Sequence, residues 1–446
     1  MKKYIGAVLA ICLSGLLAMV TTGAENFDAA VYVETLFSGD ASVLTQDYNY
    51  TEELLDAMEK SGGLEGLRTS LKVFGELQET GEPIISEIMG YTCYSVPCTF
   101  ELQKLNFVIN VDGDGQIAGI VTAPYNEGTN VREESSERVA EIREIEVNLP
   151  IDGEKGRELP GTLTLPEGEG LFPVVILIHG SGPNDRDETI GNNKPFRDIA
   201  YGLSKQGIAV YRYDKRTYVY GQEMAEDTEM TLEEETILDA VKAVEILKEQ
   251  DQINPEQIYL AGHSLGGQAL PAIHGALTDS TDVAGYIFMA APARKLQELM
   301  REQYDFLYSL TPELDEIQAE QKKEVYAELD RLLNELESLK DDEAVLGAYG
   351  TYWKNLNGYD QVTEAANISK PCLVLQGEED YQVTMEDFEI WQDAYGKEDN
   401  WEFISYAGLT HLFMQGEKEN GSGDYLKEQQ VDSRVIADIS AFVLRK

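Results

Sequence analysis

A pentapeptide of the form Gly-x-Ser-x-Gly lies between an apolar run and a helical stretch. It consists of Gly262-His263-Ser264-Leu265-Gly266 and follows the apolar residues 258–261. A serine on a sharp turn from strand to helix has strained backbone angles and no room for side chains beside it, so glycines flank it. Such a turn exposes the hydroxyl group of the serine. The pattern therefore predicts that Ser264 is a nucleophile, in a fold where strand, tight turn and helix follow one another.

A glycine-rich loop upstream predicts a site for the negative charge that such a nucleophile creates. The apolar residues 173–178 end in His179-Gly180-Ser181-Gly182-Pro183, as expected of a buried parallel strand that opens into a loop. We expect the backbone N–H of Ser181 to donate to an oxyanion. The second donor is the N–H of Leu265, because the turn places it at the positive N-terminal end of a helix.

Two later strands end in residues that complete a catalytic set. Residues 371–377 are typical of a buried strand and are followed by Glu378-Glu379-Asp380. Residues 401–406 are predicted to form the next strand and are followed by a short loop with His411. A carboxylate orients a histidine, and a histidine takes the proton of a serine hydroxyl. The resulting order, serine, acid and then histidine, is that of the α/β-hydrolases. Three carboxylates compete for the role of the acid at this stage.

The chain between these motifs alternates strands with helices. Strands are predicted at residues 144–149, 161–165, 207–213 and 285–289, and helices at residues 196–206, 232–248 and 265–277. This alternation predicts an α/β fold with a doubly wound, mostly parallel sheet and a pocket at the carboxyl ends of its strands. Of the four histidines, His179, His263 and His274 are interpreted as structural.

Six motifs in the correct order make residues 141–446 resemble the secreted bacterial esterases of the α/β-hydrolase superfamily, which are grouped with the serine aminopeptidase-like hydrolases. These motifs lie at residues 179–189, 212–216, 262–267, 290–294, 377–383 and 408–413. The resemblance implies a carboxylesterase for short acyl chains, with Ser264 as nucleophile, Asp380 as acid and His411 as base. A serine aminopeptidase or acylaminoacyl peptidase with the same triad is the first alternative. A catalytically silent binding protein is the second.

The resemblance also implies a helical cap over the active site, at about residues 295–355. Residues 295–310 and 311–339 have helical patterns, and the second run starts with Thr311 as N-cap. A leucine stripe in that run is interpreted as packing. Tyr352 and Trp353 follow these helices and are predicted to line the substrate pocket, on the assumption that their segment is irregular.

The first 141 residues divide into three predicted segments. Residues 1–24 combine two lysines, an apolar stretch and small residues, which indicates a signal peptide cleaved after Ala24 and hence secretion. An uncleaved membrane anchor, or a lipoprotein attached through Cys12, is the less favoured interpretation. Residues 25–125 are predicted to form a small α+β accessory domain similar to cystatin or nuclear-transport-factor folds. Residues 126–141 are predicted to be a linker. The catalytic domain then spans residues 142–446.

The net charge and the absence of metal-binding or phosphate-binding motifs limit which partners the protein can bind. A net charge of −46 repels nucleic acids and anionic lipid surfaces. The sequence has no metal-ligand spacing and its glycine-rich loop lacks a P-loop lysine, so neither a metal nor another cofactor is expected. We expect a small-molecule ester as the partner and leave the oligomeric state open. A disulfide between Cys93 and Cys98 needs a bend at Pro97 and is also left open.

Overall fold

The computed structural model describes most of residues 27–124 and nearly all of residues 142–445. Within these ranges the description omits residues 39–42, 45–47, 52–53, 56–57, 59–62, 65–67, 69–74, 89–90, 102–103, 113–114, 153–155, 192, 278–282 and 311–315. The predicted signal peptide, Cys12, the predicted linker and the Thr311 N-cap lie outside the described residues. What is described falls into two compact units, one within residues 10–136 and one within residues 137–446.

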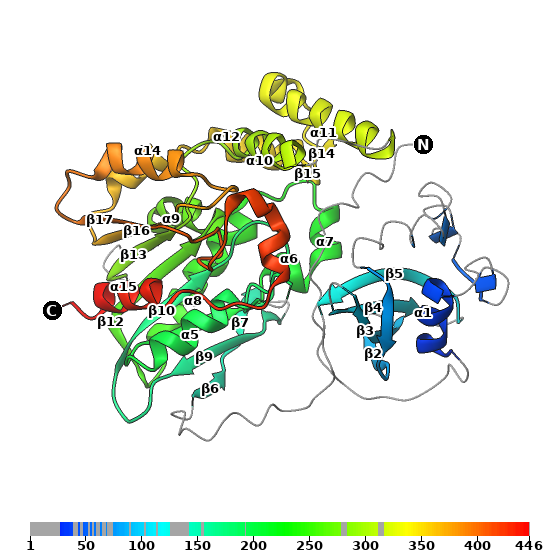
Figure 1. Cartoon of the computed structure of the whole chain (residues 1–446). Coiled ribbons are helices and arrows are strands. Elements are labelled where there is room, and N and C mark those ends of the chain that lie inside the picture. The colour runs from blue at the N-terminus through cyan, green and yellow to red at the C-terminus, as the bar shows by residue number, and fades with distance from the viewer. Residues whose placement is uncertain are drawn as a thin grey trace. The chain divides into compact units, whose positions relative to one another are not determined.

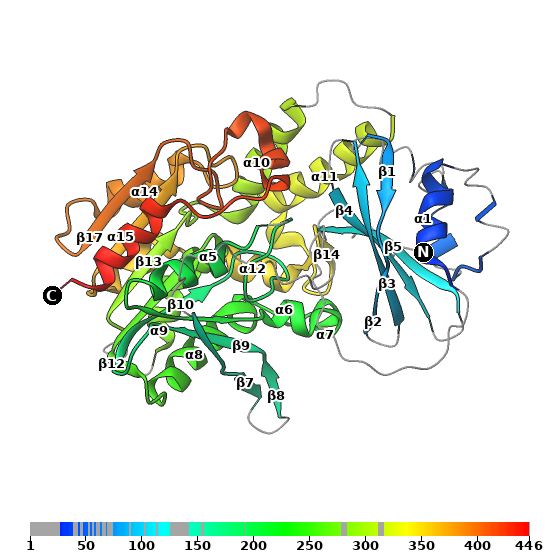
Figure 2. The ribbon, with the colours of Figure 1, turned by 60° about the horizontal axis from the view of Figure 1, so that its bottom comes forward.

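In the N-terminal unit the described residues form an antiparallel sheet and the helix α1 (Ala29–Ser38). The strands are β1 (Leu77–Thr80), β2 (Ile84–Ile88), β3 (Tyr91–Phe100), β4 (Lys104–Val111) and β5 (Ile117–Pro124). Their order is β1-β3-β4-β5, with β2 also paired to β3. Helix α1 buries Tyr32, Val33 and Leu36 in a core shared with Phe107 and Ile109 of β4. Figure 2 shows α1 beside this sheet, and the predicted α+β class is confirmed.

Cys93 and Cys98 both lie on β3, where an uninterrupted strand puts residues five apart on opposite faces. No disulfide joins these two cysteines. Cys98 instead donates its thiol hydrogen to the carbonyl oxygen of Val96 at 3.3 Å. The question that the sequence left open is thereby answered for this structure: Cys93 and Cys98 are both buried thiols that form no disulfide with each other.

The second unit is built on an eight-stranded sheet (Figure 1). Its strands are β6 (Arg143–Glu146), β9 (Gly161–Leu165), β10 (Phe172–Ile178), β11 (Ala209–Tyr213), β12 (Ile253–His263), β13 (Gly285–Met289), β16 (Cys372–Gly377) and β17 (Trp401–Tyr406). The order is β17-β16-β13-β12-β10-β11-β9-β6. From β11 to β17 all pairs are parallel, whereas β9 and β6 are antiparallel. This confirms the predicted mostly parallel sheet. A separate hairpin joins β7 (Leu149–Asp152) to β8 (Arg157–Leu159).

Helices cover both faces of this sheet, which explains why a central strand such as β10 is apolar throughout. Alternate residues of β10 divide between two cores: Val174 and Ile176 belong to one, Val175 and Leu177 to the other. The first core contains residues of α8 (Leu238–Lys248), α9 (Leu265–Ala276) and α14 (Met385–Tyr395). The second contains residues of α5 (Pro195–Ser204) and α15 (Ser433–Val443).

The predicted cap region is helical. It comprises α10 (Leu296–Leu310), α11 (Glu316–Asn334), η5 (Leu336–Ser338), the short pair β14 (Ala344–Val345) and β15 (Ala348–Tyr349), and α12 (Gly350–Gly358). In Figure 1 these helices lie together above the sheet. Leu332, Leu336 and Leu339 pack into a small core of this region, so these members of the leucine stripe serve packing, whereas Leu333 of the same stripe is exposed.

The other short helices described are α6 (Arg216–Val219), α7 (Gly221–Glu226), the π-helical turn η3 (Glu233–Ile237), α13 (Gln361–Glu364), η6 (Ala365–Asn367) and η7 (Lys418–Leu426). Among the helices that the structure describes, none is both long and apolar enough to span a bilayer.

Candidate active site

Ser264 occupies the sharp turn between β12 and α9. Its backbone has φ 52° and ψ −120°, in the left-handed region that side chains rarely adopt. A Cβ atom on Gly262 would lie 2.3 Å from the Gly266 carbonyl oxygen, and one on Gly266 would lie 2.3 Å from that of Ile178. Only glycine fits at both positions. The turn predicted from the pentapeptide is therefore present, with the strain typical of a nucleophilic serine.

His411 and Asp380 form a buried pair at the ends of neighbouring segments. The Nδ1 atom of His411 lies 2.6 Å from Oδ2 of Asp380, and the two residues are only 4% and 3% exposed. The other carboxylate oxygen accepts hydrogen bonds from the backbone N–H groups of Gln382 and Val383 at 2.7 and 3.0 Å. Gln376 donates to Oδ2 at 3.1 Å. Asp380 is thus rigidly held and can fix the orientation of the imidazole.

The two neighbouring carboxylates have other partners. Glu378 accepts a hydrogen bond from the hydroxyl of Ser405 at 2.8 Å, at an exposed position. Glu379 accepts one from the backbone N–H of Lys418 at 3.4 Å. Of the three candidates at the end of β16, the structure brings Asp380 to the histidine.

His263 connects the nucleophile turn to the loop of His411. Its Nε2 donates to the carbonyl oxygen of His411 at 3.0 Å, and the two rings lie 4.6 Å apart. Its Nδ1 lies 2.9 Å from Oε2 of Glu188. A carbonyl and a carboxylate are both acceptors, so this geometry suits an imidazolium with both nitrogens protonated. Burial disfavours that charge, but the Glu188 carboxylate outweighs burial and raises the pKa of His263.

Glu188 also holds the predicted oxyanion loop. Its Oε1 accepts the backbone N–H of Gly180 at 2.7 Å. A Cβ atom on Gly180 would lie 3.2 Å from the Cβ atom of Ser264, so the loop borders the nucleophile. Because the N–H of Gly180 is already bonded, the N–H of Ser181 is the donor of this loop that best fits an oxyanion. Leu265 begins α9, as the second predicted donor requires.

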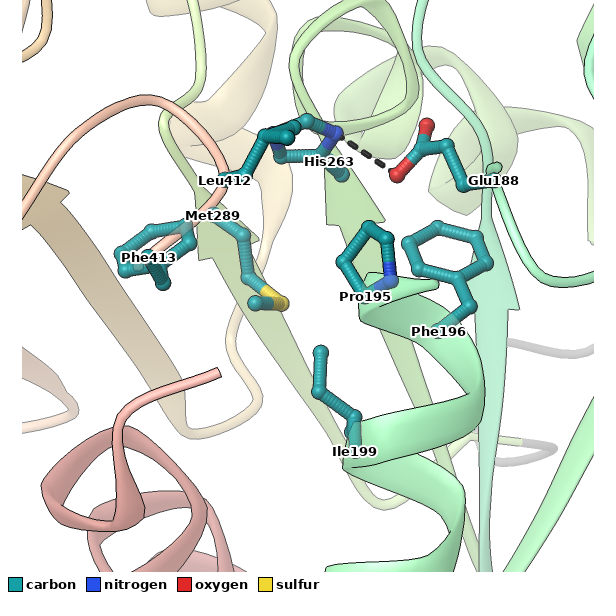
Figure 3. Close-up of a pocket in the computed structure, with 8 residues that line it drawn as sticks. All are labelled: Glu188, Pro195, Phe196, Ile199, His263, Met289, Leu412 and Phe413. Atoms are coloured by element: carbon teal, nitrogen blue, oxygen red, sulfur yellow. Dashed lines mark ion pairs between the residues drawn. The ribbon is translucent and has the colours of Figure 1, made fainter. Parts of the chain in front are cut away.

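The Glu188–His263 pair borders a small cavity (Figure 3). Its volume is about 10 Å³, and it is lined by Glu188, Pro195, Phe196, Ile199, His263, Met289, Leu412 and Phe413. A space of this size holds about one water molecule. It is therefore part of the support behind the site and not the substrate pocket.

The backbone around this support is strained at several points. Apart from glycines, five described residues have a positive φ, and besides Ser264 they include Glu188 (51°), Ala290 (46°) and Phe413 (57°). Glu188 and Phe413 line the cavity, and so does Met289, the neighbour of Ala290. Such conformations persist only where the surrounding packing enforces them, and they gather at functional sites.

Tyr352 and Trp353 do not lie on an irregular segment, so the premise of their predicted pocket role is wrong. Both belong to helix α12 and are 6% and 3% exposed. The indole N–H of Trp353 donates to the carbonyl oxygen of Val345 at 2.8 Å inside the small core of the cap. The hydroxyl of Tyr352 donates to Oε2 of Glu235 at 2.6 Å. These partners assign both aromatic residues to packing and support.

The other two histidines are structural, as expected. Nε2 of His179 lies 3.0 Å from the carbonyl oxygen of Asp185, and burial lowers the pKa of His179 to about 4. Nδ1 of His274 lies 2.7 Å from the hydroxyl of Tyr286. No group of three or more side chains suited to a metal occurs among the residues that the structure describes.

Sequence reasoning missed Glu188, Lys215 and Glu235 as parts of the site. Glu188 and Lys215 lie in the motifs at residues 179–189 and 212–216, but nothing in those motifs says which charged residues become buried. Lys215 and Glu235 are buried together, with Nζ and Oε1 2.5 Å apart. Their pairing joins segments that are 20 residues apart.

Comparisons with known proteins agree with this architecture. Residues 173–419 match the family described as serine aminopeptidase, S33. Over 443 residues the chain is 34% identical to Esterase EstD of Thermotoga maritima, which covers 98% of this chain and 100% of that protein.

Solved structures with some likeness include Est1E from Butyrivibrio proteoclasticus, at 17% identity and a TM-score of 0.43, covering 68% of this chain and 99% of that one. A Pyrococcus furiosus esterase has 14% identity and a TM-score of 0.42, covering 68% of this chain and 90% of that one. The family match spans more than half of the sequence, and the relative spans nearly all of it. The chain therefore belongs to the serine aminopeptidase, S33, family and is a serine hydrolase of the α/β-hydrolase fold.

Proposed function

We propose that this protein is a secreted serine carboxylesterase that hydrolyses short-chain acyl esters through an acyl-enzyme intermediate. The observation that carries the proposal is the buried pair of His411 and Asp380, 2.6 Å apart, on a loop that His263 fastens to the strained turn of Ser264. The preference for an ester rests on the relative named Esterase EstD, which matches the chain over almost its whole length.

In the first half of the proposed reaction, the hydroxyl oxygen of Ser264 attacks the ester carbonyl carbon while Nε2 of His411 takes the hydroxyl proton. The carbonyl oxygen becomes an oxyanion, which accepts hydrogen bonds from the N–H groups of Ser181 and Leu265. Asp380 holds the ring and stabilises the imidazolium. When the tetrahedral intermediate collapses, His411 returns the proton to the leaving alcohol, and the acyl group stays on the serine.

In the second half, water replaces the alcohol. His411 takes a proton from the water as its oxygen attacks the acyl-enzyme carbonyl, and the same two N–H groups receive the oxyanion. Collapse returns the proton to Ser264 and releases the carboxylic acid. The two halves together consume one ester and one water molecule and yield one alcohol and one carboxylic acid, with Ser264 and His411 restored.

A peptidase is the second candidate, favoured by the family description itself. The same triad cleaves amides, and the difference lies in how the substrate is held. An aminopeptidase needs a carboxylate aimed at the α-ammonium group of its substrate. Whether the cap supplies one decides between the two activities.

Secretion belongs to the same proposal. Its support is the predicted signal peptide of residues 1–24, with its lysines, apolar stretch and small residues before Glu25. N-terminal sequencing of protein recovered from the medium is expected to start at Glu25. Recovery of an intact N-terminus would oppose this part of the proposal.

Labelling with a fluorophosphonate probe tests the enzyme class. We expect the wild type to be labelled and the Ser264→Ala variant to show none, because the probe reacts only with an activated serine. Ser338→Ala is the matched control, since this serine is exposed on η5 and should leave labelling unchanged. A folded wild type that resists the probe would favour a silent binding protein.

Substrate comparison then separates esterase from peptidase. We expect p-nitrophenol to be released from acetyl and butyryl esters at least about 100-fold more efficiently, in kcat/KM, than p-nitroaniline from aminoacyl anilides, since a discrimination of this size is usual for a dedicated site. The reverse ranking would make the protein an aminopeptidase.

A further inference from the structure

Three buried polar side chains from three separate segments form a chain beneath the oxyanion loop. Lys215 follows β11, Glu235 lies in the π-helical turn η3, and Tyr352 lies on the cap helix α12. Nζ of Lys215 lies 2.5 Å from Oε1 of Glu235, whose Oε2 accepts the hydroxyl of Tyr352 at 2.6 Å. The ammonium group also donates to the carbonyl oxygen of Gly180 at 2.7 Å.

Burying this ion pair costs free energy, which suggests that it has a role beyond stability. The side chains of Lys215 and Glu235 are only 3% and 6% exposed, and removing two charges from water costs free energy that pairing recovers only with good geometry. Glu235 also sits in a π-helical turn, a distortion that often marks functional sites. The pair holds the positive charge of Lys215 against the carbonyl oxygen of Gly180.

That carbonyl belongs to the peptide whose other end is the predicted oxyanion donor. The C=O of Gly180 and the N–H of Ser181 share one trans peptide plane, so they point in opposite directions. Holding the carbonyl oxygen against Lys215 therefore turns the N–H of Ser181 away from the lysine. The amide side chain of Asn184 contacts the same oxygen and those of Ser181 and Gly182, at 3.1–3.3 Å.

The peptide is also held from its N-terminal side and lies at the nucleophile. Glu188 binds the N–H of Gly180 at 2.7 Å, so both polar groups of Gly180 have fixed partners. The Cβ atom of Ser264 is 3.2 Å from where a Cβ of Gly180 would stand. A peptide flip here would replace an N–H donor by a carbonyl oxygen, which repels an oxyanion.

We propose that Lys215 is a positioning residue for ester hydrolysis: supported by Glu235 and Tyr352, its ammonium group fixes and polarises the Gly180–Ser181 peptide so that the Ser181 N–H faces the oxyanion. This inference rests on the proposed function, because an oxyanion forms only if Ser264 attacks a carbonyl. It also gives Tyr352 a role different from the one predicted, since the cap helix supports the oxyanion loop through this hydroxyl.

The test removes the buried pair in one step. In Lys215→Met/Glu235→Gln neither partner is left as an unpaired buried charge, so folding is preserved better than in a single variant. We expect kcat for p-nitrophenyl butyrate to fall about 100-fold, as for loss of one oxyanion donor, while KM stays within about twofold. Tyr352→Phe should reduce kcat by a smaller factor, because it only loosens Glu235.

Two ketones provide a readout that a merely structural role would not change. A trifluoromethyl ketone adds to Ser264 and places an oxyanion in the site, whereas the matching methyl ketone binds as a neutral carbonyl. In the double variant, affinity for the fluorinated ketone should fall by the same factor as kcat, and affinity for the methyl ketone should be retained. Lys194→Met is the matched control, since this partly exposed lysine pairs with Asp187 at 3.2 Å and should behave as wild type.

All rates are expressed per active site, counted by exhaustive fluorophosphonate labelling. A kcat per labelled site equal to that of the wild type overturns the role of Lys215, even if less folded protein is obtained. Equal loss of affinity for both ketones also overturns it, because that indicates a distorted pocket. A wild type that does not label refutes the proposed function itself, and the two failures are thereby distinguished.

Discussion

At the scale of single residues, the Glu188–His263 pair most depends on the fold. The pair joins the oxyanion loop, the nucleophile turn and the loop of His411 through Gly180 N–H and His411 C=O. Burial acts to raise the pKa of Glu188, but the charge and hydrogen bond of His263 outweigh it and lower that pKa. The same pairing raises the pKa of His263. Both shifts mean that folding favours the charged pair.

These directions predict how stability depends on pH. Because the pKa of His263 is raised on folding, its contribution is complete below the unfolded value of about 6.5 and is lost as pH rises through the folded value. The lowered pKa of Glu188 makes its contribution complete above about 4.3 and lost as pH falls through the folded value. The pair therefore stabilises most between these limits. Once the pH exceeds the folded pKa of His263, the ring is neutral and one of its nitrogens turns a lone pair toward an acceptor oxygen.

Glu188→Gln tests this prediction, because glutamine can accept from Gly180 and donate to a neutral His263. The melting temperature of the wild type should exceed that of the variant more at pH 5.5 than at pH 9. We expect the gap to shrink by at least about 2 °C, which corresponds to about 1 kcal/mol in a domain of a few hundred residues. Glu223→Gln, on an exposed ion pair with Arg157, serves as the control. A gap that widens toward pH 9 would contradict the assignment.

At the scale of elements, the strand–turn–helix unit of β12 and α9 depends on close backbone contact with β10. Gly266→Ala would place a Cβ atom 2.3 Å from the Ile178 carbonyl oxygen and 2.7 Å from that of His179. Both obstacles are backbone atoms, one in the last residue of β10 and one in the residue that follows it. We expect the variant to be destabilised by about 1–3 kcal/mol or more, seen as a lower melting temperature, with loss of ester hydrolysis.

Gly275→Ala is the matched control on the same helix. A Cβ atom at this position meets nothing within 4 Å. Alanine is the better helix former, so this variant should keep full activity and gain up to about 1 kcal/mol of stability. Equal melting temperatures for the two variants would show that the turn tolerates a side chain at Gly266.

At the scale of the whole molecule, the groups assigned to the reaction all belong to one unit. They lie between His179 and His411, inside the unit of residues 137–446, which has its own two cores on either side of the sheet. A chain of residues 137–446 should therefore fold by itself. We expect its kcat/KM for p-nitrophenyl butyrate to stay within about twofold of the full chain, as for independent parts. A folded but inactive shortened chain would mean that the N-terminal unit contributes to the site.

The parts of the site that were predictable from the sequence are those governed by local sterics and periodicity. The pentapeptide around Ser264 specifies its turn because neighbouring glycines and one strained serine leave few backbone conformations. Apolar runs with intervening helical patterns specify the parallel sheet, because strands buried on both faces must be apolar throughout. Since catalytic groups follow the ends of such strands, the sequence alone predicts that Asp380 and His411 belong to one site.

Only the tertiary structure decided which charged and aromatic side chains support that site. Lys215, Glu235 and Tyr352 look like ordinary surface or pocket residues in the sequence, yet segments up to 137 residues apart bury them together. Glu188 could not be separated from the other carboxylates of its motif, and the helix that carries Trp353 was expected to be an irregular segment. Whether Cys93 and Cys98 meet likewise depended on the straightness of β3. The physical reason is that local patterns determine backbone form, whereas the burial and pairing of a charge depend on distant segments that pack against it.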